Sequence, residues 1–369
     1  MNITFVLPET RICGGIRSTF ELSSRMVERG HRVKVIYPLY PIANGAPWYN
    51  LKKQAGRAAR CVSRSRQPVG VDWFDLKAEL LRVPWLSNRW IPDADFIVAT
   101  WWENAFHVHR LAAGKGRKVH FIRGYETWGG PHELVTASYR LPNIKIATSG
   151  HLIELIGKEH GVTVQGPIPN GLDSSLFFRE KANVEHSGPL RVGMLYRKTS
   201  WKSIDDGLAA VAMAKQRFPG FQLVVFGEDL SQEHQHMVSS FPGTQVCGML
   251  HTDALRKLYN SLDVFLFSSQ LEGFGNPPME AMACGAACVS TAVGAVPDYT
   301  DGGSTAILVD PGDPGALAAG LVKLLENDHL RHELSEAGSR RVSKMSWSRS
   351  VISFESILEN AVGNLPEGR

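Results

Sequence analysis

Short apolar runs alternate with helix-length segments along most of this 369-residue chain, and this alternation limits the fold more than any other feature. Strands separated by helices form parallel sheets that helices cover on both faces. The first series predicts strands at residues 3–7, 33–37, 96–100, 119–122 and 145–148. The second series predicts strands at residues 190–196, 223–226, 244–246, 264–267, 287–290 and 306–309. We therefore expect an α/β protein with two Rossmann-like, doubly wound parallel-sheet domains that face a cleft.

A turn-rich segment at residues 165–173 separates the two series, and the length of the chain also favours two domains. We expect an N-terminal domain over residues 1–168 and a C-terminal domain over residues 169–345. Residues 346–369 are expected to hold a final helix that crosses back to the N-terminal domain. Residues 40–92, rich in proline and tryptophan, break the alternation and are interpreted as an insertion.

Composition excludes several classes of protein. A net charge of +4 is too small to indicate nucleic-acid binding, so no nucleic-acid partner is expected. The five cysteines form no Cys-x-x-Cys pair, which favours a reduced, cytoplasmic compartment. The N-terminus runs directly into a strand-like segment, and neither a signal peptide nor a spanning helix is predicted.

A basic run within residues 51–66 contains six lysines and arginines and no acidic residue. One interpretation is a surface for an anionic acceptor or for peripheral contact with the inner face of the membrane. The other is a solvated basic helix on the insertion, and the sequence does not separate the two.

The segment over residues 271–285 carries the clearest chemical signal. It follows an apolar strand-like run, and Pro277 and Pro278 suit the start of a helix. Free amides in the loop and a helix N-terminus favour an anion. Glu272, and Glu280 in the expected first helical turn, would repel an anion but can accept hydrogen bonds from hydroxyl groups. A ligand with both phosphates and hydroxyls, such as a sugar nucleotide, reconciles these features.

Two further loops carry groups suited to phosphate. Arg197 and Lys202 follow the first strand of the second domain, and two fixed cations can neutralise a departing diphosphate without a metal. Gly14 and Gly15 lie between the first strand and its helix, where backbone can approach a ligand closely.

Metal chemistry finds little support in the sequence. Asp93-Ala-Asp95 resembles an ion-holding pair but precedes its strand, so we interpret it as a strand-entry turn. The two His-x-His pairs lack the further ligands that zinc needs. We expect neither a metal nor another cofactor.

Arg123, Tyr125 and Glu126 follow a strand of the first domain. They are candidates for contact with an acceptor, although a structural salt bridge explains them equally well.

Together these motifs resemble the retaining glycosyltransferases of family four, which have the GT-B fold and are also described as glycosyl transferases group 1. The resemblance covers nearly the whole chain and rests on the spacing of the paired glutamates, the basic pair and the interdomain segment. Arg123 stands where many members have a histidine, and the following Tyr-Glu is similar to rhamnosyltransferase-like members.

The resemblance implies a retaining, hexosyltransferase-type enzyme (EC 2.4) that needs no metal and moves a sugar from a UDP-, GDP- or dTDP-sugar to a carbohydrate, lipid-linked or small-molecule acceptor. It implies polysaccharide or glycoconjugate synthesis, with the acceptor bound by the N-terminal domain and the nucleotide sugar by the C-terminal domain. Carried over by position, it assigns catalytic roles to Arg197, Lys202 and Glu272, and donor binding to Gly14, Gly15, Met249, Leu250, Gly273, Phe274, Gly275, Asn276 and Glu280.

Three other classes stay open at this point. A catalytically silent sugar-nucleotide-binding protein, or a sugar-nucleotide epimerase or phosphorylase, could share the fold. A nicotinamide oxidoreductase could also be built from two α/β domains, but Gly-x-Gly-x-x-Gly is missing.

Overall fold

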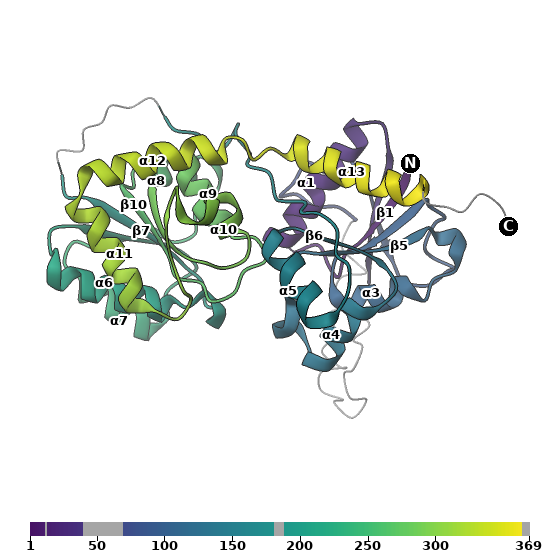
Figure 1. The fold of residues 1–369 in the computed structure, drawn as a ribbon, viewed down its shortest axis with the longest axis horizontal. Coiled ribbons are helices and arrows are strands. Elements are labelled where there is room, and N and C mark those ends of the chain that lie inside the picture. Colours follow the sequence, from purple (N-terminus) through teal and green to yellow (C-terminus); the bar gives the residue numbers. More distant parts are fainter. Residues whose placement is uncertain (12, 40–68, 181–187, 364–369) are drawn as a thin grey trace. The chain divides into compact units, whose positions relative to one another are not determined.

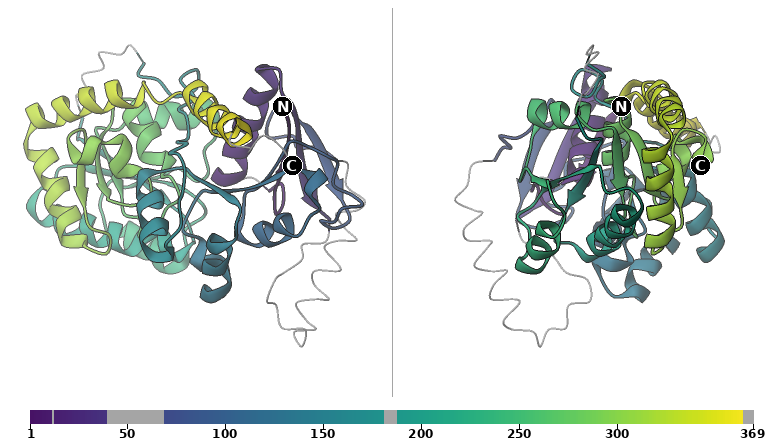
Figure 2. Two further views of the ribbon diagram at one scale, coloured as in Figure 1. Left: turned by 45° about the vertical axis from the view of Figure 1, so that its right-hand side comes forward. Right: turned by 90° about the vertical axis from the view of Figure 1, so that its left-hand side faces the viewer.

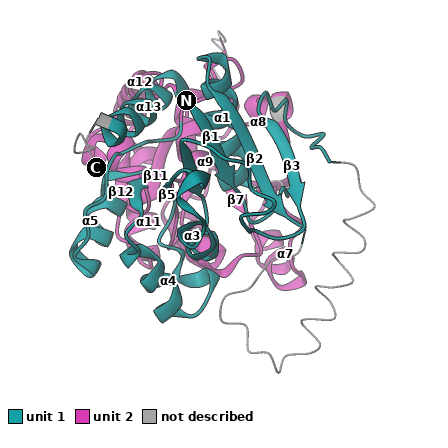
Figure 3. Ribbon diagram, turned by 90° about the vertical axis from the view of Figure 1, so that its right-hand side faces the viewer, with its two compact units in different colours: residues 1–170, 347–369 teal, residues 171–346 magenta. Residues whose placement is uncertain are grey.

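The computed structural model describes residues 1–11, 13–39, 69–180 and 188–363 (Figure 1). The chain forms two compact units (Figure 3): unit 1 contains Met1–Asn170 and Trp347–Arg369, and unit 2 contains Gly171–Ser346. The basic run within residues 51–66 lies outside the described residues. None of the described helices is long and apolar enough to cross a membrane.

Unit 1 is built on a six-stranded parallel sheet with the order β3-β2-β1-β4-β5-β6. Its strands are β1 (Asn2–Val6), β2 (Arg32–Pro38), β3 (Glu79–Val83), β4 (Phe96–Ala99), β5 (Arg117–Ile122) and β6 (Ile144–Ala147). Its described helices are α1 (Gly14–Glu28), α3 (Trp102–His109), α4 (His132–Arg140), α5 (Gly150–His160) and α13 (Trp347–Gly363), with short 3-10 turns η1 (Ala113–Lys115) and η2 (Glu126–Gly129). All five strands predicted for this part of the chain are confirmed.

One strand was not predicted. β3 lies inside the segment that we interpreted as an insertion, and it pairs in parallel with β2 from Lys34 opposite Glu79 to Pro38 opposite Val83. Of its five residues only Val83 is buried, because β3 forms the edge of the sheet. Part of residues 40–92 therefore completes the first sheet.

Unit 2 repeats this architecture with a sheet of order β12-β11-β10-β7-β8-β9, again entirely parallel. Its strands are β7 (Arg191–Tyr196), β8 (Gln222–Gly227), β9 (Gln245–Val246), β10 (Val264–Phe267), β11 (Ala287–Thr291) and β12 (Ile307–Val309). Its helices are α6 (Ile204–Arg217), α7 (Gln232–Ser239), α8 (Thr252–Asn260), α9 (Asn276–Ala283), α10 (Val296–Tyr299), α11 (Pro314–Glu326) and α12 (Asp328–Val342), with 3-10 turns η3 (Ser200–Lys202) and η4 (Asp301–Gly303). The six predicted strands are present.

Both sheets have the strand order of a doubly wound nucleotide-binding fold, so the predicted fold class is confirmed. In each sheet the first and fourth strands are neighbours, and the connections leave in opposite directions from this point. These switch points lie between β1 and β4 in unit 1 and between β7 and β10 in unit 2. Loops at the carboxyl ends of these strands are where such folds bind ligands.

The last helix of the chain, α13, packs on unit 1 beside α1 (Figures 1 and 2). Its apolar side contributes Val351, Phe354 and Leu358, each completely buried. The ring of Phe354 lies 5.9 Å from that of Phe5 on β1 and 5.6 Å from that of Phe121 on β5. The core of unit 1 is therefore completed by residues from the far end of the sequence.

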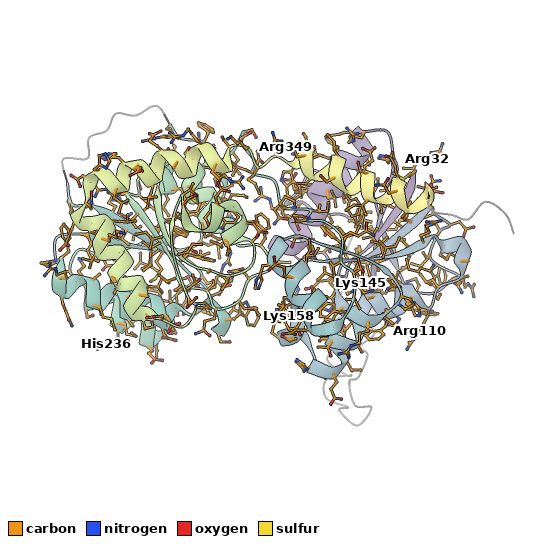
Figure 4. The ribbon with its side chains drawn as sticks, in the orientation of Figure 1. Arg32, Arg110, Lys145, Lys158, His236 and Arg349 are labelled. Atoms are coloured by element: carbon orange, nitrogen blue, oxygen red, sulfur yellow. The ribbon has the colours of Figure 1, made fainter. Side chains whose placement is uncertain are left out.

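One buried charge in unit 1 is satisfied by backbone carbonyl oxygens. Lys145 on β6, labelled in Figure 4, is buried, and its Nζ donates to the carbonyl oxygens of Leu141 at 2.7 Å and Asn143 at 3.1 Å. Burial lowers the pKa of this lysine.

Candidate ligand site at the carboxyl edge of the second sheet

The loops after β7 and β10 both begin at the carboxyl edge of the sheet of unit 2. The two strands are parallel neighbours with Leu266 opposite Met194, so both chains emerge on one side of the sheet. Because the switch point lies between these strands, the sequence-predicted residues on the two loops are placed together.

Hydrogen bonds fix these two loops to each other. The N–H of Gln270 donates to the carbonyl oxygen of Trp201 at 2.8 Å, and the Ser268 hydroxyl donates to that of Ser203 at 2.9 Å. Ser203 has φ +44°, a left-handed conformation that is strained for a serine. The Nε2 atom of Gln270 donates to the Ser203 hydroxyl at 3.0 Å and supports this turn.

The closest charged contact between the loops joins Lys202 and Glu272. Lys202 is the last residue of η3, and its Nζ lies 2.5 Å from Oε1 of Glu272. The Glu272 side chain is 10% exposed and that of Lys202 is 22% exposed, so the pair is largely screened from water. The structure thus brings together two of the three residues to which the sequence assigns catalytic roles.

The third, Arg197, follows β7 directly and pairs with an acid that sequence reasoning missed. Its Nη1 lies 3.3 Å from Oε1 of Glu228, the first residue after β8. Glu228 also accepts the backbone N–H of Lys198 at 2.8 Å. This N–H, followed by Arg197, lowers the pKa of Glu228. The one sequence signal that could have identified Glu228 is its position just after a predicted strand of the second series.

The glycine-bearing loop after β10 is closely packed. Gly275 has φ +88° at the start of α9, and its carbonyl oxygen accepts the Tyr299 hydroxyl at 2.6 Å. Phe274 is buried, with its ring 5.6 Å from that of Tyr299. A β-carbon on Gly294 would lie 2.9 Å from Cβ of Glu272, so a side chain there would push the glutamate away. Gly273 lies in the same loop.

Helix α9 begins at Asn276 and has prolines in its first turn, as the sequence predicts. Glu280 is the fifth residue of this helix and therefore lies in its second turn, one turn later than expected. The hydroxyl of Tyr259 donates to Oε2 of Glu280 at 3.4 Å. Burial, and then the Glu280 charge, raise the pKa of this tyrosine.

Met249 and Leu250 follow β9 at the same edge of the sheet. The Met249 side chain is 43% exposed, whereas Leu250 is partly buried against the core of unit 2. The preceding Gly248 has φ +65°, and its carbonyl oxygen accepts the N–H of Gly227 at 2.8 Å. This bond ties the loop after β9 to the end of β8.

In unit 1, Gly14 and Gly15 are the first two residues of α1, at the carboxyl end of β1. A β-carbon on Gly15 would lie 3.0 Å from both terminal nitrogens of Arg123, so this glycine admits the guanidinium. The Nη1 atom of Arg123 donates to the hydroxyl of Thr19 at 3.0 Å, and its Nη2 donates to the carbonyl oxygen of Thr100 at 3.1 Å. Arg123, which follows β5, thus connects to helix α1 and to the loop after β4.

Glu126 and Tyr125 are also engaged within unit 1. The Glu126 carboxylate is buried and accepts the N–H of Trp102, the first residue of α3, at 2.9 Å. Burial raises the pKa of Glu126 to about 8, although Arg123 and the Trp102 N–H act against this shift. The Tyr125 hydroxyl donates to Glu159. The three predicted acceptor residues therefore all have partners inside the unit.

The two aspartates weighed as a metal site have structural partners. Asp95 accepts the N–H of Asn2 at 2.6 Å, and Asp93 pairs with Lys115 at 2.8 Å. Among the residues that the structure describes, no group of three or more His, Cys, Asp or Glu side chains could hold a metal ion.

Comparison with known proteins confirms the resemblance to glycosyl transferases group 1, whose family profile matches residues 178–341. The chain is 35% identical over 214 residues to a D-inositol 3-phosphate glycosyltransferase of Corynebacterium jeikeium, covering 52% of this chain and 51% of the relative. It is 26% identical to a glycogen synthase of Mycobacterium tuberculosis, covering 70% and 60%. The chain thus spans between a half and two thirds of the length of these relatives.

Solved structures share the fold of the whole chain. The Anabaena protein HepE, crystallised with UDP and glucose, has a TM-score of 0.71 at 15% identity and covers 98% of this chain and 100% of its own. Sucrose-phosphate synthase from Thermosynechococcus elongatus has a TM-score of 0.71 at 16% identity, covering 99% and 100%.

Proposed function

We propose, from the match of residues 178–341 to glycosyl transferases group 1, that this chain transfers a sugar from a nucleoside-diphosphate sugar to an acceptor hydroxyl. The observation that carries the proposal is the Lys202–Glu272 pair at the switch point of unit 2. It sets a cation beside a carboxylate where a doubly wound sheet binds ligands. The cation can bind a diphosphate, and the carboxylate can accept a hydrogen bond from a sugar hydroxyl.

Arg197 and Lys202 would stabilise the departing diphosphate. Breaking the bond between sugar and phosphate builds negative charge on the leaving group. Two cations that are already positioned can neutralise this charge with little reorganisation, the electrostatic role that a divalent ion would otherwise fill. We therefore propose transfer that does not require a metal.

The glutamates would bind hydroxyl groups of the donor. Glu272, with the backbone amides of Gly273, Phe274, Gly275 and Asn276, would hold the transferred sugar, and Glu280 would accept from the ribose. Met249 and Leu250 would lie beside the base. These assignments follow the resemblance, and the common location of their loops at one sheet edge supports them.

Retention of configuration also follows the resemblance. We propose front-face transfer, in which the departing phosphate oxygen helps to remove the proton of the acceptor hydroxyl. The donor is proposed to be a hexose linked to UDP, GDP or dTDP, and the acceptor a carbohydrate, a lipid-linked molecule or a small molecule. UDP is the first choice to test, since HepE was crystallised with it. Cytoplasmic location and membrane contact through residues 51–66 stay predictions.

The test combines a donor panel with variants of the two cations. UDP-, GDP- and dTDP-sugars are screened by thermal shift, and nucleoside-diphosphate release is then measured in the presence of candidate acceptors. Arg197→Ala and Lys202→Ala should each lower kcat/KM by about 10²–10³. Lys198→Ala is the matched control. The Lys198 side chain is exposed, so this substitution removes one positive charge from the position next to Arg197. Turnover within a few-fold of the parent in both site variants would contradict the proposal.

A further inference from the structure

Each proposed phosphate-binding cation has a carboxylate partner inside unit 2, and the two pairs differ. Lys202 and Glu272 are 2.5 Å apart with side chains 22% and 10% exposed. Arg197 and Glu228 are 3.3 Å apart with side chains 37% and 35% exposed. The second pair is longer and better solvated, and such pairs contribute little stability. Arg197 can therefore exchange Glu228 for a phosphate more easily than Lys202 can exchange Glu272.

Glu228 is nevertheless fixed in place. Its own N–H donates to the carbonyl oxygen of Tyr196 at 3.1 Å, and its carboxylate accepts the N–H of Lys198 at 2.8 Å. The preceding Gly227 has φ +128°, and a β-carbon there would lie 2.1 Å from the Tyr196 carbonyl oxygen. The backbones at the ends of β7 and β8 therefore touch, and they hold this negative charge beside Arg197.

The helix that follows Glu228 is anchored to the same tyrosine. The Tyr196 hydroxyl lies 3.0 Å from Nδ1 of His234 and accepts the N–H of Ser231 at 3.1 Å. The Nε2 atom of His234 lies 2.9 Å from Oδ1 of Asp205 on α6. These contacts hold the β8–α7 loop at both ends. Because the loop is held, the Glu228 carboxylate stays beside any ligand that binds Arg197.

We propose that Glu228 competes with the diphosphate for Arg197 and thereby promotes release of the nucleoside diphosphate after transfer. This inference rests on the proposed function. The diphosphate of the donor is esterified at both ends, whereas the product has a free terminal phosphate. A free phosphate has a second pKa near 6, so the product carries about one more negative charge than the donor at pH 7.5. Glu228 therefore repels the product more strongly than the donor.

The test is Glu228→Gln, which removes the charge and keeps an oxygen for the Lys198 N–H. Isothermal titration with UDP, GDP and dTDP at 20 mM salt should show the bound nucleotide held about 3- to 10-fold more tightly by the variant. The difference in Kd between the parent and Glu228→Gln should become smaller in 0.5 M salt, because salt screens partly exposed charges. Binding of the corresponding sugar nucleotide should tighten less. Glu233→Gln, an exposed acid on α7, is the matched control and should leave the Kd unchanged.

A double-mutant cycle with Arg197→Ala identifies the pair itself, since the effect of Glu228→Gln should shrink when its partner is absent. A Kd that is unchanged or raised in Glu228→Gln at low salt would overturn the inference while leaving the proposed function in place. An equal effect in the presence and absence of Arg197 would also overturn it. Failure of the parent protein to bind any of the three nucleotides would instead remove the proposed function, and this inference with it.

Discussion

The Nζ atom of Lys202 and Oε1 of Glu272 lie 2.5 Å apart across two loops, although 70 residues separate them in the sequence. Since Glu272 is only 10% exposed, its carboxylate depends on this cation for compensation. Lys202→Met should therefore destabilise unit 2 by about 1–3 kcal/mol, in addition to its effect on turnover. The urea midpoint of unfolding measures this.

The double variant Lys202→Met/Glu272→Gln should recover much of that loss, because no charge is left without a partner. If the double variant were as unstable as the sum of the two single variants, the contact would contribute nothing as a pair.

Gly227 offers a second test, this time of the backbone beside Glu228. Gly227→Ala combines a φ of +128° with a β-carbon 2.1 Å from the carbonyl oxygen of Tyr196, and neither can be relieved by a side-chain movement. We expect a loss of at least about 2 kcal/mol and a lower kcat/KM. Gly220→Ala is the control in the same unit, since its nearest neighbour would be 3.8 Å away. Equal melting temperatures for the two variants would contradict the prediction.

Stability should depend on pH through Glu126. Burial raises its folded-state pKa from 4.5 to about 8, so the folded protein favours the neutral acid. The stability that this protonation contributes is fully present below pH 4.5 and is lost as the pH rises towards 8. The glutamine in Glu126→Gln cannot ionise. As the pH rises within that window, the free energy of unfolding of this variant should therefore increase relative to that of the parent by up to about 1.4 kcal/mol per pH unit.

Urea midpoints of the parent and Glu126→Gln at pH 5 and pH 8 give this comparison. Glu133→Gln, an exposed acid on α4, should track the parent at both values. A constant difference between Glu126→Gln and the parent would show that the buried carboxyl does not titrate in this range.

Helix α13 should be essential for unit 1. Phe354 is completely buried between Phe5 and Phe121, so Phe354→Ala should cost about 3–5 kcal/mol. Ile352→Ala on the same helix alters a side chain that is 48% exposed and should cost little. Tryptophan fluorescence during urea unfolding follows both, and similar midpoints would contradict the described packing.

Several of the buried strands were predictable because they are continuous apolar runs. β10, for example, consists of four buried residues, and strands covered on both faces leave this signal in the sequence. β3 leaves no such signal, because it lies at the sheet edge with Glu79 and Arg82 among its five residues. Its place is set by pairing with β2, which no local pattern reveals.

The candidate site was predictable only in part, for a related reason. The spacing of Glu272 and Glu280 on one loop and helix is local, and the sequence displays it directly. Glu228 is significant only because β8 lies next to β7, and this neighbourhood depends on strand order. The burial of Glu126 likewise arises from helices α3 and α4 packing over it, and its ordinary sequence context gives no sign of this.

The return of α13 to unit 1 also constrains how the protein is made. Residues 347–363 supply part of the core around Phe5. The core of unit 1 therefore cannot be completed during translation until all of unit 2 has been synthesised. Unit 2, which is continuous in sequence, has all its residues before then. We expect the half of the molecule that is translated first to be the half that finishes folding last.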